Sequence, residues 1–163
     1  MINFKNKGAL NIAYAAVIAA VYVVLTLIFA PISYGPIQVR VSEALCVLPI
    51  FTPAAVPGIF IGCLLANALG SAIIWDVVFG SLASLAAAYI SYLFRSKRVL
   101  AYLSPIVINA LVVPFVLKYA YGAEDMIWYM MFTVAAGEII SVGILGSILS
   151  IVLEKYRGIL FRE

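Results

Sequence analysis

The side chains best suited to bind a ligand form a small polar set inside an otherwise apolar sequence. Residues 33–43 read SYGPIQVRVSE, a polar, proline-marked stretch that carries Arg40 and Glu43. Charge and irregular backbone next to lipid are tolerated only where they reach water or line a protein cavity. Later apolar runs are interrupted by further candidates, namely Asn67, Trp75, Asp76, Asn109 and Glu138. The set predicts a binding pocket built into a membrane protein.

Glu138 is the most informative of these residues because no other acid lies so deep in an apolar run. It lies about 12 residues, or roughly 18 Å, below the expected start of its helix. A neutral glutamic acid that only packs is the alternative. Arg40 and Glu43, three residues apart at a helix start, can equally pair with each other.

The other candidates also have structural alternatives. Asp76 can cap the helix that begins near it. Asn67 and Asn109 can form interhelical hydrogen bonds. Trp75 is first of all an interfacial anchor, and stacking on a ligand is its second interpretation.

Composition identifies the bilayer as the solvent of this chain. Of its 163 residues, 66% are hydrophobic and 10% are charged, against about 25% charged residues in soluble domains. We expect one all-α transmembrane domain over residues 1–163, because barrel strands would alternate apolar and polar residues.

The sequence has no histidine, no metal-ligand cluster and no Walker A motif. We therefore expect no metal, no cofactor, no nucleic-acid partner, and no catalysis or ATP hydrolysis by this chain. Cys46 and Cys63 are interpreted as buried small hydrophobes.

Apolar runs and breaks predict six transmembrane helices, at about 9–30, 41–52, 55–70, 76–94, 99–117 and 126–153. The second and third are short, and a re-entrant hairpin is the alternative to two short or tilted spans. Six spans place both termini on one side, together with Lys5, Lys7, Arg95, Lys97, Arg98, Lys155, Arg157 and Arg162. The positive-inside rule makes that side cytoplasmic, although it does not separate the two topologies. We expect a multi-pass membrane protein.

The polar candidates then fall in the outer half of the membrane or near its midplane. A pocket open to the outside, closed below and capped by the 33–43 loop is the simplest arrangement. Small residues also recur at intervals that allow close helix packing. In the third helix this stripe (Gly58, Gly62, Ala66, Gly70) indicates packing within the chain. In the first helix (Ala9, Ala13, Ala16, Ala20), internal packing and contact with another protein remain open.

Three motifs are distinctive: YGPIQVRVSEALCVLPIFTPAAVPGIFIGCLLAN at 34–67, WDVVFGSLAS at 75–84 and GE at 137–138. In these motifs the sequence resembles the QueT family, substrate-binding S components of the energy-coupling factor (ECF) transporters of prokaryotic plasma membranes. It implies six transmembrane helices, an outward ligand site and a first loop that acts as a gate. It also implies docking on a transmembrane coupling protein with two cytosolic ABC-type ATPases. The implied ligand is a queuosine precursor, a 7-deazaguanine such as preQ0 or preQ1.

The resemblance also implies roles for particular residues. Members of this class carry an AxxxA pattern on the first helix for docking, which fits Ala9, Ala13, Ala15, Ala16, Ala19 and Ala20. A carboxylate can accept the two parallel N–H donors of a guanine edge, and Glu138 is the first choice for this role and Glu43 the second. The remaining binding residues would be Arg40, Asn109, Asn67 and Gln38 for polar atoms, Asp76 for an amine, and Trp75 or Tyr34 for stacking.

Three alternatives compete with this interpretation. One is an S component for another vitamin-like molecule. A second is a small membrane-embedded enzyme acting on a lipid, which the lack of histidine and of metal ligands disfavours. A third is an autonomous channel or carrier, but the polar residues do not line both halves of the membrane.

Overall fold

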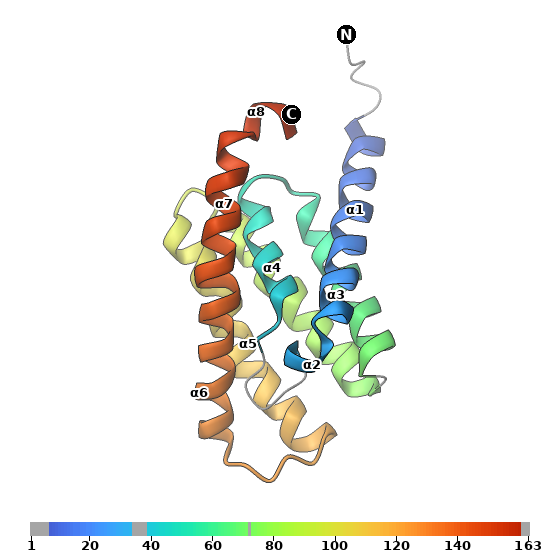
Figure 1. The fold of residues 1–163 in the computed structure, drawn as a ribbon, viewed down its shortest axis with the longest axis vertical. Coiled ribbons are helices and arrows are strands. Elements are labelled where there is room, and N and C mark those ends of the chain that lie inside the picture. The colour runs from blue at the N-terminus through green and yellow to red at the C-terminus, as the bar shows by residue number, and fades with distance from the viewer. Residues whose placement is uncertain (1–6, 34–38, 72, 161–163) are drawn as a thin grey trace.

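The computed structural model describes residues 7–33, 39–71 and 73–160, which hold helices and turns but no strand. The elements are α1 (Lys7–Ile28), α2 (Ala30–Ser33), η2 (Val41–Ile50), α3 (Ala55–Gly70), η3 (Asp76–Gly80), α4 (Ser81–Leu93), α5 (Arg98–Ala120), α6 (Ile127–Glu138), η4 (Ile139–Leu145), α7 (Gly146–Lys155) and α8 (Arg157–Leu160). η3 continues into α4, and α6, η4 and α7 form one long helical rod (Figure 1).

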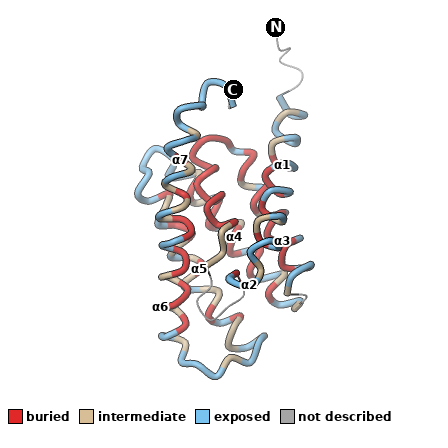
Figure 2. The backbone as a smooth tube through the Cα atoms, viewed as in Figure 1, coloured by how far each residue is buried: buried red, intermediate tan, exposed pale blue. Residues whose placement is uncertain are grey.

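Four helical stretches are long and apolar enough to cross a membrane: Lys7–Ile28, Asp76–Leu93, Arg98–Ala120 and Ile127–Lys155. They coincide with the first, fourth, fifth and sixth predicted spans. Their outward faces carry exposed large apolar side chains, whereas buried residues line the centre of the bundle (Figure 2). Exposing so much apolar surface to water would be unfavourable, whereas contact with lipid acyl chains is favourable. The chain is therefore an all-helical, multi-pass membrane protein.

The two remaining apolar helices, η2 and α3, have only 10 and 16 residues. They extend about 20 Å and about 24 Å, compared with about 30 Å for the hydrocarbon core. η2 is a 3₁₀-helix, and every residue from Ser42 to Ile50 is buried. It lies at the centre of the bundle in contact with α1, α3, α4, α5, η4 and α7. Such irregular backbone is possible at membrane depth because protein surrounds it on all sides.

Glycines let the surrounding helices approach closely. A Cβ on Gly58 would lie 2.9 Å from the Ala15 carbonyl oxygen, and one on Gly62 would lie 2.7 Å from Tyr22 Cβ. Gly58 and Gly62 therefore pack α3 against α1 within the chain, as the stripe predicted. Gly146 likewise lets α7 pack closely against η2, because a Cβ added at this position would lie 2.7 Å from Val47 Cγ1.

The start of α1 and the end of α7 with α8 lie at the same end of the bundle (Figure 1). The Tyr14 hydroxyl donates a hydrogen bond to the Leu160 carbonyl oxygen, 2.7 Å away. At this end Arg98 of α5 also forms a 2.8 Å ion pair with Glu154 of α7. The α5–α6 connection lies at the opposite end, which is the end nearest the candidate site.

Candidate substrate-binding site

A small polar cavity lies among η2, η3, α4, α5 and α6. Its lining residues are Arg40, Glu43, Asp76, Gly80, Ser84, Asn109, Val113 and Glu138. Five of them were predicted from the sequence: Arg40, Glu43, Asp76, Asn109 and Glu138. The cavity has a volume of about 20 Å³, room for about one water molecule. Sites for small organic ligands usually measure about 300–1,000 Å³, so a ligand of that size does not fit the cavity at its present width.

Glu138, which lines the cavity, has a carboxyl oxygen that accepts no hydrogen bond from the described residues. Its side chain is buried, and Asn109 Nδ2 donates a 2.8 Å hydrogen bond to Oε1. Among the described residues, no group donates to the buried Oε2 atom. A buried acceptor without a partner costs about 1–3 kcal/mol. A ligand that offers N–H donors would remove this cost.

Glu43, by contrast, has partners within the protein for both of its carboxylate oxygens. The Tyr22 hydroxyl of α1 donates to Oε1, and Cys46 Sγ donates to Oε2 at 2.9 Å. Glu43 and Tyr22 are both fully buried. This difference in hydrogen bonding favours Glu138 over Glu43 as the acceptor for a ligand. Tyr22 was missed from the sequence, although it and Thr26 are polar residues spaced by one turn in an otherwise apolar helix.

Asp76, Gly80 and Ser84 follow one another at intervals of four and line the same cavity. Asp76 is the third residue of its helical stretch. Its Oδ2 atom accepts a 2.7 Å hydrogen bond from the Tyr121 hydroxyl, beyond the end of α5. The carboxylate therefore joins two helices. Ser84, which the sequence interpretation did not select, was detectable from its position two turns after Asp76.

Both Asp76 and Glu138 stand at boundaries of π-helical segments. Asp76 is the first residue of η3, and Glu138 immediately precedes η4. One turn of π-helix holds an extra residue compared with an α-helix, so the side chains that follow are rotated about the helix axis. Such π-helical turns are frequent at functional sites. The two acids thus occupy positions at which the helix geometry changes.

Asn67 and Trp75 do not line the cavity. Asn67 Nδ2 donates to the Asp76 carbonyl oxygen at 3.3 Å, which makes it an interhelical link between α3 and η3. Its buried Oδ1 atom has no partner among the described residues. Trp75 is 58% exposed and stacks on Phe79 with ring centres 5.9 Å apart. The candidates Tyr34 and Gln38, and the cap formed by the 33–43 loop, lie wholly or in part outside the described residues.

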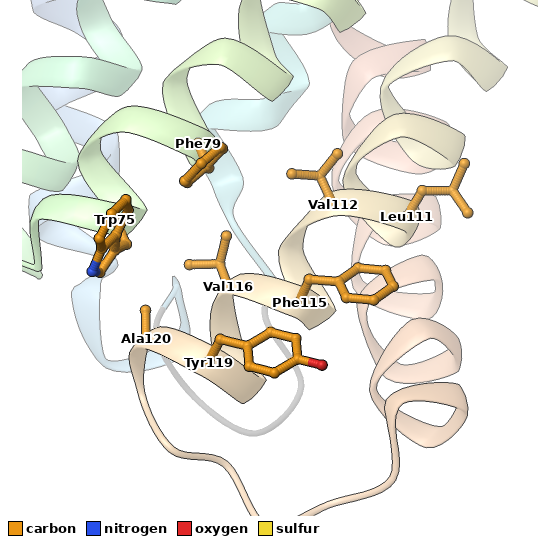
Figure 3. Close-up of a pocket in the computed structure, with 8 residues that line it drawn as sticks. All are labelled: Trp75, Phe79, Leu111, Val112, Phe115, Val116, Tyr119 and Ala120. Carbon is orange, nitrogen blue, oxygen red and sulfur yellow. The ribbon is translucent and has the colours of Figure 1, made fainter.

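Trp75 instead belongs to an apolar groove of about 590 Å³ between η3 and α5 (Figure 3). Its walls are Trp75, Phe79, Leu111, Val112, Phe115, Val116, Tyr119 and Ala120. The groove contains no charged side chain and lies on the outward face of the bundle, where lipid acyl chains would fill it. The small polar cavity, rather than this larger groove, therefore carries the candidate chemistry.

Enlarging Gly80 should weaken ligand binding. A Cβ at this position would lie 2.9 Å from Asn67 Nδ2 and 3.0 Å from Asp76 Oδ1, so both side chains must shift. We expect Gly80→Ala to lower the stability of the protein by about 1–3 kcal/mol and to reduce affinity for its ligand. Thermal unfolding and a binding titration measure the two effects. Gly143→Ala is the matched control, because its Cβ would meet only Ile139 Cγ2 at an ordinary 3.7 Å.

The alanines of α1 divide into two groups. Ala15 and Ala19 are buried near Gly58 and Gly62 of α3. The exposed alanines are Ala9, Ala13, Ala16 and Ala20. A groove of about 490 Å³ runs between the two helices, lined by Asn11, Ile12, Ala15, Ala16, Ala19, Pro53, Ala54, Pro57 and Ile61. The stripe of Ala9, Ala13, Ala16 and Ala20 is thus exposed and available to another molecule, whereas Ala15 and Ala19 pack within the chain.

In the described part of the chain, no group of three or more histidine, cysteine, aspartate or glutamate side chains is placed to hold a metal ion. Cys46 and Cys63 are both buried free thiols. The polar side chains that line the cavity carry carboxylates, an amide, a hydroxyl and one guanidinium. Together they can form hydrogen bonds with a polar organic molecule.

Comparisons with known proteins agree with this description. The profile of the QueT transporter family matches residues 12–155. The queuosine precursor transporter QueT of Lactococcus lactis subsp. cremoris (strain MG1363) is 39% identical over 83 residues, which are 50% of this chain and 48% of that protein. The match therefore spans about half the length of this relative, and no solved structure matches the chain. Because the family profile covers most of the sequence and every cavity residue, the chain belongs to the QueT transporter family.

Proposed function

We propose that this chain is the high-affinity substrate-binding membrane subunit of an ECF-type importer for a queuosine precursor. The observation that carries the proposal is the buried Glu138 carboxylate, one oxygen of which has no described partner, beside a polar cavity. Membership of a transporter family supports transport rather than catalysis. The relative from Lactococcus supplies the substrate class, because its name specifies a queuosine precursor.

A 7-deazaguanine such as preQ0 or preQ1 matches the donors and acceptors of the cavity. Its guanine edge offers two parallel N–H donors, and a carboxylate oxygen accepts up to two hydrogen bonds. Glu138 can therefore accept both donors while Oε1 keeps its bond from Asn109. We assign Ser84, Arg40 and the side-chain oxygen of Asn109, which all belong to lining residues, to other polar atoms of the ring. An analogue that lacks the donor edge would leave buried polar groups of the site without hydrogen bonds, so its binding should be much weaker.

Binding requires the cavity to widen from about 20 Å³. Residues 34–38 precede the lining residues Arg40 and Glu43 in the sequence. We assign them to a gate, with Tyr34 and Gln38 as ligand contacts. Closure over the ligand would then exclude water and strengthen each polar contact.

An ATP-driven importer of this kind requires partners, because this chain has no Walker A motif of its own. We assign these partners as a transmembrane coupling protein and two cytosolic ABC-type ATPases. The groove between α1 and α3, with exposed Ala16 at its margin, is the surface assigned to the coupling protein. Small side chains there allow the helix of a partner to approach closely.

We further propose six spans in a prokaryotic plasma membrane, with both termini cytoplasmic. The four long helices would then be complemented by two short spans, η2, which protein encloses, and α3. The basic residues of 95–98 and 155–157 would face the cytoplasm, as the positive-inside rule requires.

Titration of the purified chain with 7-deazaguanines tests the ligand assignment. We expect micromolar or tighter binding without ATP, and a thermal shift that grows with ligand concentration. Guanine should bind more tightly than hypoxanthine, which lacks the exocyclic amino donor. Binding of riboflavin or thiamine instead would retain a solute-binding subunit but remove the substrate. Turnover of a lipid by the isolated chain would remove the functional class.

A further inference from the structure

The charged groups that line the cavity are not balanced. Glu43, Asp76 and Glu138 contribute three carboxyl groups and Arg40 one guanidinium, so acidic groups outnumber basic groups. Neutral donors such as Asn109 satisfy individual oxygens but do not balance a negative charge. Uncompensated charge is costly away from water. A ligand that carries a cationic group would therefore gain more from this cavity than a neutral ligand of the same shape.

Asp76 is the carboxylate best placed to receive such a group. Glu43 is enclosed by its bonds to Tyr22 and Cys46, and Glu138 is assigned to the donor edge of the ring. Asp76 is buried, and Tyr121 holds its Oδ2 atom at 2.7 Å. A Cβ built on the lining residue Gly80 would lie 3.0 Å from its Oδ1 atom. One oxygen is thus anchored, and the other lies beside a residue that lines the cavity.

The backbone around Tyr121 is itself held in place. Gly122 adopts a left-handed conformation with φ of 69°, which glycine accommodates without strain. Lys118 Nζ donates to the carbonyl oxygens of both Glu124 and Asp125 at 3.2 Å. The connection between α5 and α6 is therefore folded back on the end of α5. This arrangement fixes the hydroxyl that contacts Asp76.

We propose that Tyr121 is a specificity-determining residue that acts through Asp76. Its hydroxyl orients this carboxylate as the counter-ion for a cationic substituent on the ligand, so the site prefers an amine-bearing 7-deazaguanine over its neutral nitrile analogue. Tyr121 is a positioning residue, because it acts through the Asp76 carboxylate. The proposal rests on the proposed function and extends it from a ligand class to a charge preference.

Comparison of two ligands in the full-length purified protein tests this role. We expect wild type to bind 7-aminomethyl-7-deazaguanine at least about tenfold more tightly than 7-cyano-7-deazaguanine. Tyr121→Phe removes only the hydroxyl, and it should reduce that ratio several-fold by weakening the amine ligand alone. A purely structural role would weaken both ligands equally, so the ratio separates the two explanations.

Two further variants complete the comparison. Tyr119→Phe is the matched control, because Tyr119 lies in the last turn of α5, two residues before Tyr121, is 77% exposed and lines the apolar groove. It should leave both affinities unchanged. Asp76→Asn should also lower the ratio, and Tyr121→Phe should then add little in the Asp76→Asn background, because both changes act on one interaction.

The outcomes distinguish this proposal from the proposed function. A wild-type protein that binds both ligands equally, or a Tyr121→Phe variant whose ratio is unchanged, would overturn the role of Tyr121 while leaving the substrate class intact. A wild-type protein that binds neither ligand would overturn the substrate class, and the charge preference with it.

Discussion

Glu138→Gln should weaken binding of a 7-deazaguanine at least about 100-fold. The change preserves side-chain volume but replaces one acceptor oxygen by an N–H donor, which would face the donors of the ligand. Hydrogen bonds to charged groups contribute about 1.5–3 kcal/mol each, and two such bonds are at stake. The ligand-free protein should remain folded, because Glu138 Oε2 has no described partner to lose. Calorimetric titration measures the affinity, and thermal unfolding checks the fold.

Glu154→Gln provides the control for this change. Glu154 makes an exposed ion pair with Arg98 at the opposite end of the bundle, and such pairs contribute little to stability. Its replacement should leave binding unaltered. An affinity within threefold of wild type in Glu138→Gln would show that Glu138 does not accept the donor edge of the ligand.

Replacing Ala16 and Ala20 together by leucine should abolish uptake by the assembled transporter while leaving ligand binding by the isolated chain unchanged. Both alanines are exposed on α1, and Ala16 lines the groove between α1 and α3. Leucine would hold a partner helix away from this surface but would not disturb the core. We expect at least a tenfold loss of uptake of labelled substrate in cells, with an unaltered dissociation constant for the purified protein.

Val17→Leu with Val21→Leu is the matched control. These residues have the same spacing and are 62% and 42% exposed, but they do not line the groove. Their replacement should preserve uptake. Normal uptake in the Ala16, Ala20 double variant would exclude this face as the docking surface. Ala15 and Ala19 are unsuitable for the test, because both are buried beside α3 and leucine would disturb folding.

Hydropathy was sufficient to predict the four long helices, because lipid requires long apolar segments. The convergence of Arg40, Glu43, Asp76, Asn109 and Glu138 was predictable for the same reason, since polar groups at membrane depth turn toward one another. The six-span topology, the orientation of the termini and the roles of the site residues remain predictions.

Side-chain direction was harder to predict. Trp75 directly precedes Asp76, yet successive helical residues point about 100° apart, and Trp75 faces the outer groove while Asp76 faces the cavity. The π-helical turns at η3 and η4 shift the register further, so a period of 3.6 does not locate these side chains. The bonds of Tyr22 to Glu43 and of Tyr121 to Asp76 join residues 21 and 45 positions apart. Local patterns contain no information about such pairs.

The enclosure of η2 has a consequence for biogenesis. Residues 41–50 are synthesised early, but they pack against Gly146 of α7, which is synthesised about a hundred residues later. Until then this ten-residue 3₁₀ segment lacks part of its protein surroundings, and the membrane cannot satisfy its polar groups. Insertion and folding are therefore separate events in this chain, and a nascent protein released before α7 would leave its centre open to the quality-control proteases of the membrane.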